Sequence, residues 1–307
     1  MSASSGPTTL SLASAAPRLR RERILAIGLM AMALVCFTAL DSSAKYLSRE
    51  LPAVEIVWAR YIGAALVAAT ATRVFRRPRL LRSRRPLLQG LRSLLLFGST
   101  VGNFVALRKL QLAETSTIAF LAPMFVALLA GPLLGEWPGR ARLAAIAAGF
   151  LGVLIATRPG AHAFQAIVLV AVAGALCNAG YFLATRGVAK YDSGQTTLLW
   201  TQVVGVLALT PLLPWFWTAP IDARGWIVML GMGAFGVVGH ALLIKAHRLA
   251  PASVLAPFGY TQLLWMIASG WFIFGDWPPA TTFVGAALVV ACGLFLLLYE
   301  RRTSAKA

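Results

Sequence analysis

The sequence predicts an all-α integral membrane protein with ten transmembrane helices arranged as two inverted five-helix repeats. Three observations support this fold class: an apolar composition, ten apolar segments of membrane-spanning length, and an internal duplication. The 307 residues are 59% hydrophobic and only 12% charged, and the mean hydropathy is +0.76. A soluble domain carries roughly 25% charged residues. So apolar a chain is expected to have lipid as its solvent.

The ten segments are defined by length, because a helix needs about 20 apolar residues to cross a bilayer. The first follows four arginines (Arg18, Arg20, Arg21 and Arg23), an order that also occurs in signal peptides. Its apolar run is longer than a signal peptide requires and shows no cleavage site, so we expect a retained helix after a disordered tail at residues 1–23. The predicted spans are 24–47, 53–72, 86–107, 114–135, 141–157, 163–185, 194–213, 225–245, 253–274 and 280–299.

The internal duplication is clearest in two tetrapeptides. Gly135–Pro138 (GEWP) recurs 140 residues later as Gly275–Pro278 (GDWP). Shorter matches in the same order include Val101-Gly102-Asn103 with Val238-Gly239-His240, and Trp58-Ala59-Arg60 with Trp200-Thr201-Gln202. We assign repeat 1 to residues 24–157 and repeat 2 to residues 163–299. Five spans is an odd number, so the repeats have opposite orientation, as in many secondary transporters.

The basic residues predict the orientation. Of the 28 Lys and Arg residues, 20 fall on the side that holds the N-terminal tail, the loop at 73–85 and the C-terminal tail at 300–307, and six fall on the other side. By the positive-inside rule both termini are cytoplasmic, in a bacterial inner membrane. The net charge of +18 is then explained by anionic lipid rather than nucleic acid. The expected partners are the bilayer and a small molecule. The oligomeric state stays open, and a monomer is compatible with the pattern.

Several of these residues resemble the drug/metabolite transporter superfamily and its EamA-type repeat. The similar features are Arg60 in the second span, Leu134-Gly135-Glu136, the stretch GFLGVLIATRPG at 149–160, and, in the second half, Ala250–Ser253 with Pro257, Tyr260 and Phe274-Gly275-Asp276. The resemblance includes the aromatic amino-acid exporters of that superfamily. It implies ten spans in two inverted halves and a central substrate path lined by spans one, three, four, six, eight and nine. Asp276 departs from the glutamate usual at its position.

Charged residues within spans require a partner or a role, because burying them in a bilayer is costly. Arg60 either snorkels outward or pairs with Glu55, or else holds a substrate carboxylate or helix carbonyls; we favour the structural role. Arg92 is predicted to snorkel to the cytoplasmic edge. Asp41 is predicted to pair with Lys45 one turn along the helix, and a proton-coupling role is the alternative.

No carboxylate is expected deep in the bundle, because Asp41 and Glu55 lie near the outer ends of their spans. This pattern favours gradient-driven export over proton coupling. His240 is predicted to donate a hydrogen bond between helices. Asn103 and His240 occupy equivalent positions of the inverted repeats, so we expect them beside opposite gates, and substitution of either by alanine is expected to alter the transport rate.

Two prolines are predicted to bend their helices, Pro123 in the fourth span and Pro257 in the ninth, because proline removes a backbone donor. An aromatic cavity with few charges suits neutral or aromatic zwitterions. Asn178 and Tyr181 are the polar candidates of the sixth span, where interhelical hydrogen bonding is the alternative. The predicted substrate pathway comprises Phe37, Asn103, Phe120, Pro123, Asn178, Tyr181, His240, Pro257, Tyr260 and Trp265, with Asp41 and Arg60 as charged candidates.

Other functions are less well supported by the sequence. The three histidines and three cysteines are scattered, so neither a metal, a disulfide nor a catalytic set is predicted, and no cofactor is expected. Gly231–Gly236 matches G-x-G-x-x-G, but no strand precedes it, and helix packing explains it better. We therefore predict a transporter rather than an enzyme or a scaffold, with export of aromatic or neutral amino acids first and import of a vitamin or nucleoside-like nutrient as the alternative.

Overall fold

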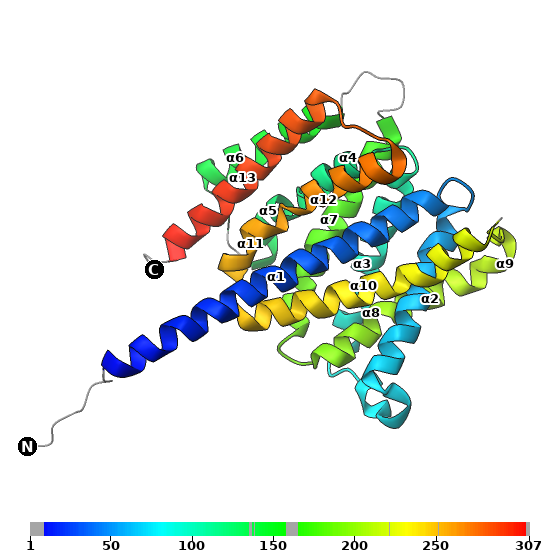
Figure 1. The fold of residues 1–307 in the computed structure, drawn as a ribbon, viewed down its shortest axis with the longest axis horizontal. Helices are drawn as coiled ribbons and strands as arrows, with labels where there is room; N and C mark the ends of the chain where they lie inside the picture. Colours follow the sequence, from blue (N-terminus) through cyan, green and yellow to red (C-terminus); the bar gives the residue numbers. More distant parts are fainter. Residues whose placement is uncertain are drawn as a thin grey trace, which may run out of the picture.

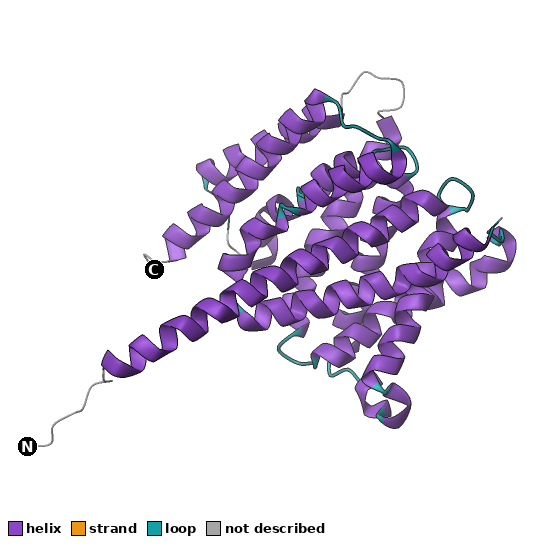
Figure 2. Cartoon of the chain, viewed as in Figure 1, coloured by secondary structure: helices purple, strands orange, loops and turns teal. Residues whose placement is uncertain are grey.

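Helices form at the predicted segments. The computed structural model describes residues 9–134, 137, 139–157, 165–220, 222–250 and 252–304, and these contain helices and turns without a strand (Figure 2). Repeat 1 holds α1 (Thr9–Leu47), α2 (Ala53–Thr72), α3 (Pro86–Leu107), α4 (Leu112–Ala119), α5 (Ala122–Leu134) and α6 (Arg140–Thr157). Repeat 2 holds α7 (Gln165–Val188), α8 (Gly194–Leu209), α9 (Leu213–Phe216), α10 (Ala223–Leu249), α11 (Ala252–Gly259), α12 (Gln262–Ser269) and α13 (Ala280–Ser304).

Short elements complete the chain. The 3-10 helices η1 (Val74–Arg76) and η2 (Pro78–Leu81) connect α2 to α3, and η3 (Thr210–Leu212) connects α8 to α9. A π-helical segment, η4 (Gly270–Phe274), follows α12 and leads into the second tetrapeptide, Gly275–Pro278. Gly275 ends it with a φ of 71°, a left-handed conformation that glycine adopts without steric cost.

Local sequence sets the helix boundaries. Asp222 and Ser193 precede α10 and α8, and their side-chain oxygens accept hydrogen bonds from the backbone N–H groups of Gly225 and Thr196. Gln111 and Glu114 form a reciprocal capping box that begins α4. This capping box therefore fixes the start of α4 at one end of the bundle.

The N-terminal prediction requires a correction. The predicted disordered tail is helical from Thr9 onwards, because α1 begins there, well before the predicted span at residue 24. The stretch before the arginines is rich in alanine and leucine, which favour helix. In Figure 1 this part of α1 projects away from the other helices. Residues 1–8 and 305–307 lie outside the described residues.

The fourth and ninth predicted spans are both divided. Helix α4 stops before Phe120 and α5 starts at Ala122, while α11 stops at Gly259 and α12 starts at Gln262. Pro123 lies in the first turn after one break and Pro257 lies just before the other, as expected from the missing N–H of proline. Among the described residues, nine helical stretches are long and apolar enough to cross a membrane. The divided fourth span is in this set as Leu112–Leu129, and the predicted ninth span is not.

Helix pairing follows the predicted inversion. The contact between α1 and α10 has its counterpart in the contact between α7 and α3, in which each helix is replaced by its mate from the other repeat. The pairs α6–α13 and α2–α8 each join a helix to its own mate, and the contact between α4 and α12 joins the divided fourth span to the divided ninth. Figure 1 shows α6 and α13 along one edge of the molecule and α2 near the other. Such pairing is what a two-fold axis between inverted repeats produces.

Glycines allow the closest approaches. Gly102 of α3 packs on Gly174 of α7, and its repeat mate Gly239 of α10 packs on the ring of Phe37 of α1. Small residues at such contacts let two backbones come together where lipid provides no hydrophobic driving force. In the G-x-G-x-x-G stretch, Gly233 lies against Gly63 of α2, which confirms a packing role for that glycine.

Candidate functional site

A cavity of about 270 Å³ lies in the middle of the bundle, lined by α1, α2, α3, α4, α7, α10 and α12. Apart from α2 these helices belong to the predicted spans one, three, four, six, eight and nine. Seven of the predicted residues line this central pocket: Phe37, Asp41, Arg60, Asn103, Asn178, Tyr181 and His240. Hydroxyl and amide groups that the sequence analysis did not select also line it, namely Ser99, Thr100, Thr115, Ser116 and Gln262.

Arg60 reaches this pocket from α2 with its side chain 9% exposed. Its guanidinium carbon lies 4.8 Å from the ring centroid of Tyr61, and its Nη1 is buried without a hydrogen-bond partner. The predicted partner, Glu55, accepts a hydrogen bond from the backbone N–H of Thr218 at 2.9 Å instead. A buried cation with an open donor is exceptional, because most buried polar groups are paired.

Asp41 lies in the pocket wall, and two expectations about it were wrong. It does not pair with Lys45, because Lys45 bonds Asp276. Asp41 was also expected near the outer end of its span, but it lines the central pocket. The expected absence of a deep carboxylate therefore no longer supports export without proton coupling. The Oδ1 atom of Asp41 accepts a hydrogen bond from Asn103 Nδ2 at 3.0 Å. The two side chains come from α1 and α3 and meet only in the folded bundle.

His240 contacts Phe37 edge-to-face, with ring centroids 5.0 Å apart, where an interhelical hydrogen bond was predicted. Both His240 and Asn103 line the same pocket. Their positions beside opposite gates stay a prediction. Repeat mates come together here because the inverted repeats cross at the middle of the bundle.

Arg92 is held by a complete set of acceptors. Its Nε donates to Thr185 at 2.8 Å, its Nη1 to Thr201 at 2.7 Å and its Nη2 to the Tyr181 hydroxyl at 2.9 Å. With 4% exposure it is buried in the bundle rather than snorkelling to the edge as predicted. Tyr181 thus combines the predicted interhelical hydrogen bond with a place in the pocket wall.

The remaining predicted pathway residues lie elsewhere. Phe120 and Tyr260 sit at the two helix breaks and contact each other edge-to-face at 5.0 Å. The side chains of Pro123 and Pro257 are exposed on the outside of the bundle. Trp265 lines a separate groove of about 820 Å³ between α1, α10 and α12. These five residues are not among those that line the central pocket.

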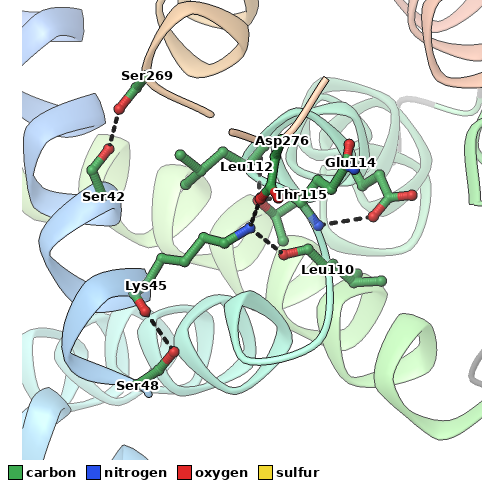
Figure 3. Close-up of polar contacts among 10 residues, drawn as sticks. Ser42, Lys45, Ser48, Leu110, Leu112, Glu114, Thr115, Ser269 and Asp276 are labelled. Carbon is green, nitrogen blue, oxygen red and sulfur yellow. Dashed lines mark hydrogen bonds and ion pairs between the residues drawn. The ribbon is translucent and has the colours of Figure 1, made fainter. Parts of the chain in front are cut away.

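One end of the bundle is closed by an ion pair that the sequence analysis missed. We call the end where α1 begins and α13 finishes the termini end, and the other the opposite end (Figure 1). At the opposite end Lys45 Nζ lies 2.6 Å from Asp276 Oδ2 and also donates to the Leu110 carbonyl at 3.4 Å (Figure 3). One turn deeper, the hydroxyls of Ser42 and Ser269 are 2.6 Å apart. These contacts join α1 to the broken ninth span and to the start of α4.

The termini end has a second connection between the repeats. Asp192, between α7 and α8, accepts hydrogen bonds from the Ser83 hydroxyl, the Arg84 backbone N–H and the Gln89 amide at the start of α3. Partial burial raises the pKa of Asp192, but these hydrogen bonds and the Arg84 charge outweigh it and lower the pKa below its ordinary value. Asp192 therefore stays ionised and joins the two repeats.

The described residues contain no group of three or more His, Cys, Asp or Glu side chains able to hold a metal ion. What the pocket does offer is one guanidinium with an open donor, one carboxylate, a ring of hydroxyls and several aromatic faces. The chemistry of this set suits the binding and orientation of a polar organic molecule. Neither Lys45 nor Asp276 could have been paired from the sequence, because 231 positions separate them.

Comparisons with known proteins agree with this architecture. The sequence model of the EamA-like transporter family matches residues 24–158 and 165–299, one match for each repeat. An S-adenosylmethionine uptake transporter of Rickettsia conorii is 25% identical over 90% of this chain and 93% of its own length. A riboflavin transporter of Vibrio cholerae is 30% identical over 60% of this chain and 61% of its own.

Two further comparisons extend the match. A pseudopaline exporter of Pseudomonas aeruginosa is 28% identical over 86% of this chain and 93% of its own length. One solved crystal structure shares the fold with a TM-score of 0.58 at 20% identity, covering 89% of this chain and 98% of that one. The all-α two-repeat fold class is thereby confirmed. The chain belongs to the EamA-like transporter family and is a multi-pass membrane transporter of small molecules.

Proposed function

We propose that this transporter exports amino acids, aromatic and neutral ones first, from the cytoplasm across a bacterial inner membrane. The observation that carries the proposal is the central pocket, in which aromatic faces surround a single guanidinium and a single carboxylate. A cavity of about 270 Å³ lies near the lower limit of small-molecule sites, which begin at about 300 Å³. It fits a compact, nearly neutral metabolite.

Alternating access follows from the inverted repeats. The excess of Lys and Arg at the termini end supports a cytoplasmic location for that end. The Lys45–Asp276 ion pair then faces outward. Release to the outside requires this ion pair to open, while the helix breaks beside Pro123 and Pro257 provide places where the fourth and ninth spans bend. A single chain contains the complete pathway, so a monomer is sufficient.

The second candidate is uptake of a larger metabolite. Relatives named as S-adenosylmethionine and riboflavin transporters favour it, the first of these over nearly the whole chain. Both compounds are larger than an amino acid. Their entry requires a wider pocket than this closed arrangement provides.

The deciding experiment is transport by the purified full-length protein in liposomes. The panel comprises labelled L-phenylalanine, L-leucine, S-adenosylmethionine and riboflavin, each with and without an imposed pH gradient. Saturable, gradient-independent flux of the amino acids is expected. Flux of S-adenosylmethionine or riboflavin alone would support the second candidate, and strict dependence on the pH gradient would make Asp41 the first residue to test for coupling.

A further inference from the structure

We propose that Arg60 and Asp41 bind the two charged ends of a zwitterionic substrate, Arg60 its carboxylate and Asp41 its ammonium group. This inference rests on the proposed function, because it assigns the charges of the pocket to an amino-acid substrate. It requires a substrate that carries a free carboxylate and a free ammonium group together.

The first step is the open donor of Arg60. The guanidinium is 9% exposed, it lines the pocket, and its Nη1 has no hydrogen-bond partner. Arginine presents its donors as a planar fork that matches the two oxygens of a carboxylate. A ligand carboxylate in the pocket would satisfy the donor that the protein leaves unpaired.

The contrast with Arg92 supports a ligand-binding role. Both arginines are buried within spans and both stack on a tyrosine, Arg60 on Tyr61 and Arg92 on Tyr181. Arg92, however, donates from all three of its nitrogens to protein acceptors. The protein therefore supplies an acceptor to every nitrogen of Arg92, whereas Nη1 of Arg60 has none.

The second step is the carboxylate of Asp41. Asn103 donates a hydrogen bond to its Oδ1, and Asp41 is a half-buried side chain that lines the pocket. Asp41 and Arg60 line one cavity without forming an ion pair with each other. Opposite charges that face a cavity but do not neutralise each other suit a ligand with both charges.

The remaining wall defines the substrate side chain. Phe37, Phe182 and Tyr181 offer aromatic faces. Among the described residues that line the pocket, Arg60 and Asp41 are the charged side chains, and His240 is the one further side chain that protonation can charge. The repeat mate of Arg60 is Gln202, which is buried outside the pocket wall. Both charged groups therefore come from repeat 1, so the substrate has one orientation rather than two equivalent ones.

The test compares three compounds that differ in charge. L-Phenylalanine has both groups, L-phenylalaninamide lacks the carboxylate, and 3-phenylpropanoate lacks the ammonium group. Equilibrium binding to the wild-type protein in nanodiscs is expected to be about 10- to 100-fold tighter for L-phenylalanine than for either analogue, the range for charged hydrogen bonds. In Arg60→Gln the preference over the amide should disappear. In Asp41→Asn the preference over 3-phenylpropanoate should disappear, while the amide is still rejected.

Controls separate binding from folding. Arg108→Gln removes an exposed cation at the opposite end and should leave all three affinities unchanged. Thermal denaturation of each variant reports folding. If Arg60→Gln does not fold, Arg60→Lys keeps the charge but loses the planar fork and should lower the preference over the amide, and Asp41→Asn tests the other half independently.

The outcomes distinguish this inference from the proposed function. Equal weakening of L-phenylalanine and its amide by Arg60→Gln would show a structural role and overturn the assignment, while transport of amino acids would stand. Binding of riboflavin without any zwitterion would also overturn it, since riboflavin has neither charged group. Absence of flux for the whole panel with folded protein would reject the proposed function itself.

Discussion

Two buried arginines show how surroundings set the role of one residue type. Arg92 is paired with Thr185, Thr201 and Tyr181, so its charge is compensated by oriented oxygens. Arg60 keeps an open donor in a cavity. A span that buries arginine must supply such acceptors or reserve the group for a ligand, because an unpaired buried charge is costly. The two arginines therefore have different roles: Arg92 supports the structure, and Arg60 is proposed to bind the substrate.

The Arg92 network gives a prediction about stability. Thr201→Val removes the nearer acceptor of Arg92 Nη1 and leaves only the Thr197 carbonyl at 3.5 Å, while keeping the branched shape of the side chain. The loss of this hydrogen bond is expected to lower the free energy of unfolding by about 1–3 kcal/mol. Unfolding in mixed detergent micelles measures it, with Thr70→Val as control. Thr70 is exposed and bonds only its own helix, and a loss as large there would contradict the network.

At the scale of helices, close packing at small residues holds neighbouring helices together, because lipid provides no hydrophobic driving force between them. Helix α3 meets α7 at Gly102 and Gly174, where backbone lies against backbone. The counterpart contact between α10 and α1 uses Gly239 but places the Phe37 ring against it. The same glycine position therefore serves a close helix crossing in repeat 1 and an aromatic wall of the pocket in repeat 2.

Gly102→Ala is expected to destabilise the bundle. Its Cβ would lie 2.8 Å from the Cα of Gly174 and 2.9 Å from the Val170 carbonyl, so backbone must shift, at a cost of about 1–3 kcal/mol. Thermal denaturation in detergent measures the loss. Gly231→Ala is the matched control, because nothing lies within 4 Å of that Cβ. An unchanged melting temperature for Gly102→Ala would show that α3 and α7 can separate freely.

At the scale of the whole molecule, contacts between the repeats differ at the two ends. The opposite end is joined by Lys45–Asp276 and Ser42–Ser269, and the termini end by Asp192 with the start of α3. Lys45 and Asp276 are 14% and 31% exposed, so solvent screens their attraction only in part. This ion pair joins α1 to the end of the broken ninth span. A contact between repeats that move must be able to break, and a partly exposed ion pair meets that requirement.

Asp276→Asn is expected to favour opening of the opposite end. Exposed ion pairs contribute about 0.2–1 kcal/mol, which corresponds to an increase of up to about fivefold in the ratio of open to closed states. The measurement is labelling of Ser116→Cys in the pocket wall by an impermeant maleimide, after the native cysteines are replaced by alanine. A maleimide added on the side of the membrane that the opposite end faces is expected to label this cysteine faster in Asp276→Asn than in the protein that keeps Asp276.

Two variants control this measurement. Asp222→Asn removes a carboxylate at the same end but keeps the N-cap of α10, because asparagine caps as well as aspartate. It should leave the labelling rate unchanged. The exchanged pair Lys45→Asp with Asp276→Lys should restore the slow rate, and failure to do so would show that the effect comes from something other than the ion pair.

The number of spans, most of their boundaries and the inverted duplication could be predicted from the amino-acid sequence alone. The physical reason is local: in lipid every backbone group must be satisfied within its own helix, so length and hydropathy are sufficient. The limits of α2 and α3 were predicted to the residue, and the divided fourth and ninth spans follow from Pro123 and Pro257. The helical start of α1 at Thr9 was missed because a tail of small residues was expected to stay disordered.

Which polar residues meet depends on how the helices pack and could not be predicted from the sequence. Asp41 and Asn103 are 62 positions apart, and Lys45 and Asp276 are 231 apart. Whether such groups touch depends on how each helix is rotated about its axis and on which helix lies beside it, and a helix of apolar residues on all sides carries no signal for either. The sequence therefore supplied the residues of the pocket, while packing selected Arg60, Asp41 and His240 for its wall and left Pro123, Pro257 and Trp265 outside it.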